Sequence, residues 1–168
     1  LMLKSINCGD LRLSHAGQSV TLAGWVHRRR DHGALVFIDL RDRSGIVQIT
    51  CDAQAFAAAH AVLNGVRSEY VIQVTGAVRP RPAGLTNPNL PTGEVEVVAE
   101  SARILNEART TPFYINEDAD IDEALRLKYR YPDLRRPPTQ RNINLRHDVV
   151  KLIRVHRTAQ GFLEIETP

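Results

Sequence analysis

Residues 19–51 read SVTLAGWVHRRRDHGALVFIDLRDRSGIVQITC, and this stretch decides the fold. Its first eight residues alternate apolar and polar side chains, as a half-buried β-strand does. Two further apolar runs follow, each preceded by residues that are typical of turns. The expected strands are 19–26, 35–40 and 46–51, with turns at 31–33 and 44–45.

The next part of the sequence extends this β-rich pattern. Residues 52–65 are rich in alanine and predict a helix, with Asp52 as its N-cap and Gly65 as its C-terminal stop. The strand pattern returns at residues 70–78 and 94–99, on either side of a loop rich in Pro, Gly and Asn. Three strands, a helix and two strands are the order of an OB-fold, a mainly β, five-stranded Greek-key barrel. Another small β-barrel or a sandwich is the alternative.

The C-terminal part of the sequence has a different character. An acidic segment at 116–126 is followed by proline, tyrosine and charged residues, which indicates a hinge with a short helix. Apolar residues then recur at helical spacing from Asn142 to about Gln160, and Gly161 is expected to end that helix. The expected organisation is an OB-fold domain at 1–106, a hinge at 107–140 and the start of a second domain at 141–168.

Composition excludes several classes of protein. Of the 168 residues, 43% are apolar, which predicts a packed core, and no apolar run is long enough to cross a membrane. Cys8 and Cys51 form no disulfide framework, and reduced thiols favour a cytoplasmic protein. The six histidines show no zinc-ligand spacing, so no metal site is expected. The net charge of +3 is compatible with a polyanionic partner.

Strand alternation places chemically useful side chains on the outside of the predicted barrel. If Val36 and Ile38 point inward, Phe37 points outward, and the same count turns Gln48 and Glu96 outward. An unpaired base can stack on an exposed phenyl ring, an amide can match the edge of a base, and a carboxylate can accept from guanine. Arginines that can neutralise phosphate cluster at positions 28–30, at 79 and 81, and at 135–136.

Each of these residues also has a purely structural explanation. The alternatives are a Phe37 ring buried in the core, a Gln48 amide solvated on a strand, a solvated turn at 28–30, acidic side chains at 94 and 96 that keep an edge strand soluble, and a turn role for His32. The convergence of the candidates on one face of the barrel favours binding of single-stranded nucleic acid.

Three strings resemble one enzyme family, in the same order and spacing along nearly the whole chain. Residues 24–49 (GWVHRRRDHGALVFIDLRDRSGIVQI) are similar to the opening of the anticodon-binding domain of bacterial-type aspartyl-tRNA synthetases. Residues 126–136 (RLKYRYPDLRR) resemble the junction between hinge and catalytic domain, and residues 161–168 (GFLEIETP) the end of the first class II synthetase motif. One departure is Pro132, where the family usually has Leu, because proline removes a backbone donor.

This resemblance implies roles for the outward side chains by their position. Phe37 would stack on the middle anticodon base, a uracil, and Gln48 would form a hydrogen bond with it. Glu96 would meet the first anticodon base, a guanine or its modified form. The remaining contacts to the anticodon and its backbone fall to four arginines, namely Arg28, Arg30, Arg79 and Arg81.

The resemblance also bears on tRNA specificity. The aspartate and asparagine anticodons differ only in their last base, which is cytosine in one and uracil in the other. Family members that charge both tRNAs tend to carry His and Gly at the positions of His32 and Gly84, whereas strict members tend to carry Leu and Lys. Relaxed specificity for tRNA(Asp) and tRNA(Asn) is therefore expected, because Gly84 has no side chain that could exclude the wrong last base.

For the full-length enzyme, the resemblance implies ligation of aspartate to tRNA with ATP and Mg²⁺, by a homodimer with an α+β catalytic domain. The second and third class II motifs would lie beyond Pro168, so no catalytic residue is expected among these 168 residues and the chain alone should be inactive. Two alternatives belong to other classes. One is a stand-alone OB-fold module that binds single-stranded nucleic acid without catalysis, and the other is a non-catalytic interaction or regulatory fragment.

Overall fold

The computed structural model describes residues 3–115 and 120–166, so part of the predicted acidic segment and the last two residues of the chain lie outside the described residues. The chain divides into two compact units, residues 1–111 and 112–168. The finer division into an OB-fold domain at 1–106, a hinge at 107–140 and the start of a second domain at 141–168 stays a prediction.

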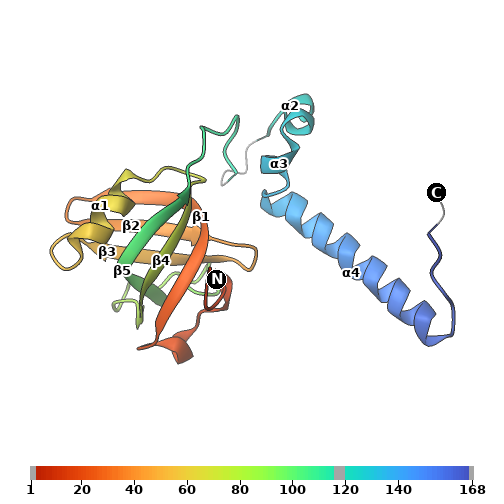
Figure 1. The fold of residues 1–168 in the computed structure, drawn as a ribbon, viewed down its shortest axis with the longest axis horizontal. Helices are drawn as coiled ribbons and strands as arrows, with labels where there is room; N and C mark the ends of the chain where they lie inside the picture. The colour runs from red at the N-terminus through yellow and green to blue at the C-terminus, as the bar shows by residue number, and fades with distance from the viewer. Residues whose placement is uncertain (1–2, 116–119, 167–168) are drawn as a thin grey trace. The chain divides into compact units, whose positions relative to one another are not determined.

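The first unit is a closed barrel of five strands with one helix (Figure 1). The order around the barrel is β1-β2-β3-β5-β4; β3 and β5 are parallel, and the other neighbours are antiparallel. This arrangement is that of an OB-fold, so the predicted fold class is confirmed. The elements are η1 (Cys8–Asp10), η2 (Leu13–His15), β1 (Ser19–His32), β2 (Leu35–Arg41), β3 (Ile46–Asp52), α1 (Ala57–Gly65), β4 (Val71–Pro80) and β5 (Val95–Asn106).

The first strand is longer than its sequence pattern predicts. β1 runs to His32, because its arginine-rich end pairs with β2 after a bulge between Val26 and Arg28. The predicted turn at 31–33 therefore starts two residues too early, since Asp31 and His32 still belong to β1 and the two-residue connection is Gly33-Ala34. Polar residues fill the end of β1, so the apolar alternation that marks a strand is missing there.

The helix between β3 and β4 begins later than predicted. Asp52 is the last residue of β3, and its carboxylate accepts a hydrogen bond from the Gln54 N–H at 2.8 Å. Phe56 takes the N-cap position of α1, so the predicted N-cap role of Asp52 is wrong. The existence of the helix is confirmed, and its buried residues Ala59 and Leu63 join the barrel core.

Alternate residues of the strands fill the interior of the barrel. Val36, Ile38 and Leu40 of β2 are at most 1% exposed, as the alternation predicts. Val47 and Ile49 of β3 are buried in the same way. Each fully buried aliphatic side chain of this kind stabilises the fold by roughly 1.5–3 kcal/mol. Because the apolar residues lie inside, the residues between them form the outer face of the barrel.

The segment before β1 is held to the barrel through Asp42. The Asp42 carboxylate accepts hydrogen bonds from Lys4 Nζ at 2.8 Å, from the Cys8 N–H at 2.9 Å and from the Ser44 hydroxyl at 2.5 Å. Burial raises the pKa of Asp42, but the hydrogen bonds from Lys4, Ser44 and Cys8 outweigh it and hold this pKa at about 2.

The second unit consists of three helices among the described residues. They are α2 (Glu123–Lys128), α3 (Arg130–Asp133) and α4 (Pro137–Ala159). Asp122 caps α2, because its carboxylate accepts from the Leu125 N–H at 3.1 Å. Pro132 lies in the first turn of α3, where a backbone N–H has no partner within the helix, so the family departure at this position is compatible with the helix.

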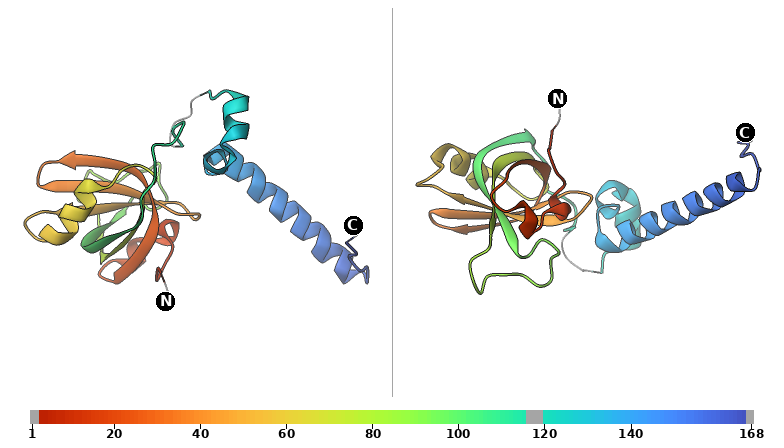
Figure 2. Two further views of the ribbon diagram at one scale, coloured as in Figure 1. Left: turned by 45° about the horizontal axis from the view of Figure 1, so that its top comes forward. Right: turned by 90° about the horizontal axis from the view of Figure 1, so that it is seen from below.

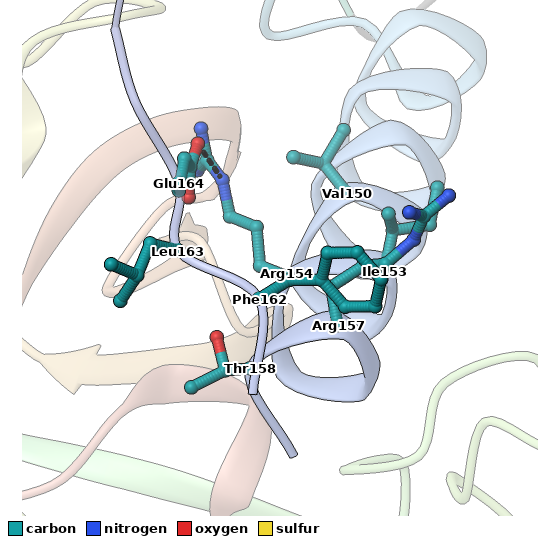
Figure 3. Close-up of a pocket in the computed structure, with 8 residues that line it drawn as sticks. All are labelled: Val150, Ile153, Arg154, Arg157, Thr158, Phe162, Leu163 and Glu164. Carbon is teal, nitrogen blue, oxygen red and sulfur yellow. Dashed lines mark hydrogen bonds and ion pairs between the residues drawn. The ribbon is translucent and has the colours of Figure 1, made fainter. Parts of the chain in front are cut away.

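Apolar side chains of α4 are open to solvent in this chain. Seven of them are between 37% and 68% exposed, namely Ile143, Leu145, Val149, Val150, Leu152, Ile153 and Val155. After Gly161, at φ +83°, the chain turns back along α4. The two segments line a cavity of about 460 Å³, where Arg154 Nε donates to Glu164 Oε1 at 2.8 Å and the Phe162 ring lies beside Arg157 (Figure 3).

Candidate nucleic-acid interface

One hydrogen-bonded network on the outer face of the barrel takes a residue from every strand. The strand registers bring these residues together, since Asp39 lies opposite Gln48 and Arg79 lies opposite Glu96. The parallel pairing of β3 with β5 sets Gln48 beside Glu96. The members are Arg30 of β1, Asp39 of β2, Gln48 of β3, Arg79 of β4 and Glu96 of β5.

The Gln48 amide is at the centre of this network. Its Nε2 donates to Glu96 Oε2 at 2.8 Å, and its Oε1 accepts from Arg30 Nη2 at 3.1 Å. Arg30 Nη2 also donates to Asp39 Oδ1 at 2.9 Å. On the other side, Arg79 Nε donates to Glu96 Oε1 at 2.8 Å. Both ends of the amide and both oxygens of the Glu96 carboxylate are therefore engaged.

Two of the predicted base-reading side chains are less exposed than the sequence led us to expect. Gln48 is 8% and Glu96 is 2% exposed, so neither side chain is open to solvent although both point outward. Both lie outside the apolar core, as predicted, but the guanidinium groups of Arg30 and Arg79 bind them from the neighbouring strands. Sequence alternation reports the direction of a side chain and carries no information about which long side chains lie across it.

Phe37 lies on the same outer face and is half-buried. The ring is not part of the barrel core, so the core interpretation of Phe37 is wrong. The His32 ring meets it edge-on, with 5.5 Å between centroids, and Arg30 Cζ lies 5.8 Å from its centroid. The Arg30 guanidinium therefore lies against both Phe37 and Gln48. These are the two side chains that the family resemblance assigns to the middle anticodon base.

Arg81 enters this face from the residue after β4. Its Nε donates to the Val95 carbonyl at 3.1 Å, and its Nη2 is buried with no hydrogen-bond partner among the described residues. Burial lowers the pKa of Arg81, while Glu96 and Asp39 nearby raise it and Arg30 lowers it further. An arginine remains charged at neutral pH, so this Nη2 is able to donate to an oxygen or a ring nitrogen.

The loop between β4 and β5 contains Gly84 and extends away from the barrel (Figure 2). The Leu85 N–H donates to the Pro82 carbonyl at 3.0 Å, which closes a turn with Gly84 at φ +80°. A β-carbon added at Gly84 would meet no atom within 4 Å, so the position is open in space but strained for any other residue. At this turn of the loop, Gly84 therefore presents no side chain to solvent.

The predicted site residues of β1 lie on the outer face of the barrel. Arg28, Arg30 and His32 lie on β1 opposite Asp39, Phe37 and Leu35 of β2, which sets them on the outer face. Arg28 and His32 are exposed, and Arg30 is tied into the network. Asp39 is a member of the network that the sequence analysis did not single out. The signal was present, since Asp39 shares its strand face with Phe37.

Within residues 3–115 and 120–166, no group of three or more His, Cys, Asp or Glu side chains is placed to hold a metal ion. None of the helices in the same ranges has the length and apolar character needed to span a bilayer.

Family models match both parts of the chain. Residues 20–105 match the model described as OB-fold nucleic acid binding domain. The chain belongs to this family. Its residues 122–168 match the model for class II tRNA synthetases (D, K and N), so the OB-fold domain is followed by the start of a class II synthetase domain.

Curated relatives of this OB-fold chain are aspartate–tRNA(Asp/Asn) ligases. The protein from Moorella thermoacetica is 58% identical over 165 residues, which cover 98% of this chain and 27% of the relative. The protein from Heliobacterium modesticaldum is 56% identical over 95% of this chain and 26% of its own length. The chain thus spans about a quarter of these relatives, and the resemblance to bacterial-type aspartyl-tRNA synthetases is confirmed.

Solved structures share the fold of the OB-fold chain at low sequence identity. Asparaginyl-tRNA synthetase from Pyrococcus horikoshii superposes with a TM-score of 0.82 at 23% identity, over 99% of this chain and 38% of that one. Aspartyl-tRNA synthetase from Entamoeba histolytica gives a TM-score of 0.85 at 20% identity, over 99% and 39%. At this identity the comparison supports the fold alone.

Proposed function

We propose that this chain is the anticodon-recognition region of an aspartate–tRNA ligase. The observation that carries the proposal is the outer face of the barrel, where a phenyl ring, an amide, a carboxylate and several guanidinium groups lie together. Such a set offers a stacking surface, matched donors and acceptors and positive charge, which together suit unpaired bases. The names of the curated relatives support the choice of aspartate.

In this proposal each anticodon base has its own contacts. The middle uracil stacks on Phe37 and pairs with the Gln48 amide. The first base, guanine, meets the Glu96 carboxylate. Arg81 and Arg79 contact the last base and the backbone, and Arg28 with Arg30 faces the anticodon loop. Because Arg79 is bonded to Glu96 in the RNA-free structure, we expect this guanidinium to shift or to share the carboxylate when guanine binds.

Relaxed tRNA specificity is part of the proposal. Its support is the pair His32 and Gly84, together with the names of relatives that are ligases for both tRNA(Asp) and tRNA(Asn). A glycine in this turn of the loop leaves the last anticodon base without a side chain at position 84 that would favour cytosine over uracil. Tolerance of both tRNAs follows from this missing contact.

The parent enzyme would be a cytoplasmic homodimer that activates aspartate with ATP and Mg²⁺ before transferring it to tRNA. No residue of this chain is assigned to ATP or to the metal ion. The exposed apolar side chains of α4 would pack on the remaining part of the synthetase domain and its dimer partner.

A binding assay with short RNA hairpins tests the proposal. The 168-residue chain is titrated into a fluorescent stem-loop with the anticodon GUC and into the same stem-loop with the middle uracil replaced by cytosine. We expect binding to the cytosine hairpin to be about tenfold weaker, because a mismatched donor or acceptor is left unpaired. Equal affinity for both hairpins would instead favour the stand-alone module for single-stranded nucleic acid.

A matched pair of variants connects the result to the site. Gln48→Ala should remove the preference for uracil, whereas Gln54→Ala, at an exposed glutamine before α1, should leave both affinities unchanged. Thermal melting of both variants checks that the barrel remains folded. A full preference for uracil in folded Gln48→Ala would contradict the assignment of this amide.

A further inference from the structure

Asp39 is bonded to a residue that has two other partners in the interface. Its Oδ1 accepts from Arg30 Nη2 at 2.9 Å, and the same Nη2 donates to the Gln48 amide oxygen at 3.1 Å. The Arg30 guanidinium also lies 5.8 Å from the centroid of the Phe37 ring. Arginine has several rotatable bonds, so a carboxylate partner is what holds one guanidinium position among many.

The partners of Gln48 allow its amide only one orientation. Glu96 offers carboxylate oxygens to Nε2, and Arg30 offers only N–H groups to Oε1. If the amide were turned by 180°, its oxygen would face the carboxylate and its N–H groups would face the guanidinium. Both hydrogen bonds would then be lost and replaced by repulsion. Arg30 and Glu96 together thus fix the orientation of the Gln48 amide, and Asp39 in turn holds Arg30 in place.

The orientation of an amide decides which pyrimidine it can pair with. Uracil presents a carbonyl oxygen beside an N3–H, so it needs an N–H followed by an oxygen. Cytosine presents an amino group beside an unprotonated N3, so it needs the same two groups in reversed order. A glutamine that is free to turn can pair with either base, whereas a locked glutamine pairs with one of them.

We infer that Asp39 is a positioning residue that selects uracil over cytosine at the middle anticodon position, by fixing Arg30 and through it the Gln48 amide. The inference rests on the proposed function, because it assumes that Gln48 meets this base. Asp39 itself needs no contact with the RNA. The Gln48 amide can still form hydrogen bonds with a base while it is bound in the network, because Nε2 has a second N–H and Oε1 has a second lone pair.

The substitution Asp39→Asn separates positioning from simple charge. Removing a carboxylate from an RNA-binding face strengthens attraction for any RNA, so a charge effect alone predicts tighter binding to both hairpins. Loss of positioning predicts the opposite for the uracil hairpin. We expect the ratio of the two dissociation constants, cytosine over uracil, to fall about fivefold, which corresponds to one hydrogen bond.

Asp31→Asn is the matched control. Asp31 forms an ion pair with Arg29 at 3.1 Å near the same end of β1 and β2, so its replacement makes the same change in charge without touching the Gln48 network. The ratio should stay at the wild-type value in this variant. In an Arg30→Ala background, Asp39→Asn should have no further effect on the ratio, because Asp39 is inferred to act through Arg30.

The outcomes of this experiment are distinct. If the wild-type chain shows no preference for uracil, the proposed function fails before Asp39 is tested. If the wild-type preference is present and Asp39→Asn keeps it, the positioning role is overturned. If Asp39→Asn unfolds the barrel, Arg30→Met, which keeps an unbranched side chain but has no donor, removes the same ion pair from its other end. A folded Arg30→Met variant with the full wild-type ratio would overturn the inference equally.

Discussion

Replacing Phe37 by leucine separates the two tasks of this ring, stability and stacking. Leucine keeps an apolar side chain on the outer face of β2 but has no flat aromatic surface. In the RNA-free structure the ring contacts the His32 ring edge-on and the Arg30 guanidinium. Such contacts contribute about 0.5–1.5 and 0.5–1 kcal/mol respectively, so Phe37→Leu should lower the free energy of unfolding by about 1–2 kcal/mol.

The effect on RNA binding should appear in addition to the effect on stability. Stacking of a base on an aromatic side chain contributes roughly 1–3 kcal/mol, so the dissociation constant for the GUC hairpin should rise roughly 5- to 150-fold. Thermal melting gives the stability, where 1–2 kcal/mol corresponds to a decrease of about 5–15 °C in Tm for a domain of this size. Fluorescence anisotropy at 25 °C then gives the affinity of the folded variant.

Phe56→Leu supplies the comparison for Phe37→Leu. Phe56 is a partly buried phenylalanine that packs against the core at the start of α1. Its replacement should lower Tm to a similar extent and leave RNA affinity unchanged. A folded Phe37→Leu variant that binds the hairpin within about twofold of wild type would refute the stacking role and with it the central contact of the interface.

Two further predictions concern the loop and the N-terminal segment. Gly84→Lys should lower the free energy of unfolding by about 1 kcal/mol, because φ is +80° there, with no clash at the β-carbon. Combined with His32→Leu in a full-length ligase, it should reduce charging of tRNA(Asn) relative to tRNA(Asp); an unchanged ratio would contradict the specificity argument. Because the pKa of Asp42 is lowered to about 2, its stabilisation is complete above pH 3.8 and is lost as pH falls towards 2. Asp42→Asn should remove about 1–2 kcal/mol at pH 7 and flatten this acid dependence in denaturant titrations, whereas an equal acid dependence in both proteins would place its origin elsewhere.

Sequence periodicity was sufficient to predict most of the barrel. The inward residues Val36 and Ile38 and the outward residue Phe37 follow from alternation alone, because a strand with one buried face leaves no other choice. The helix α1 was predicted from its alanine-rich composition, but its start was not. Asp52 looks like an N-cap in sequence, yet the β3–β2 pairing extends through this residue and decides the boundary.

Long-range pairing explains what the sequence could not reveal. Gln48 and Glu96 are 48 residues apart, and their hydrogen bond exists only because β3 and β5 pair in parallel. The buried ion pair between Arg41 and Glu69, at 2.7 Å, is a second example. Glu69 also adopts φ +65°, which no local pattern indicates for a glutamate. In the first case the register of two strands brings the groups together, and in the second a turn before β4, in which the Glu69 N–H donates to the Val26 carbonyl at 2.8 Å, places Glu69 beside Arg41.

The charges of the interface are divided between the network and its surroundings. Arg30 and Arg79 are balanced within the network by Asp39 and Glu96, so these four side chains carry no net charge. Arg81 lies outside this balance, with a buried Nη2 that has no acceptor among the described residues. An unbalanced cation attracts any RNA, whereas a neutral network with fixed donors and acceptors distinguishes base edges. In the proposed function, base selectivity therefore depends mainly on the neutral network and affinity more on the surrounding arginines such as Arg81, so a change that strengthens one can weaken the other.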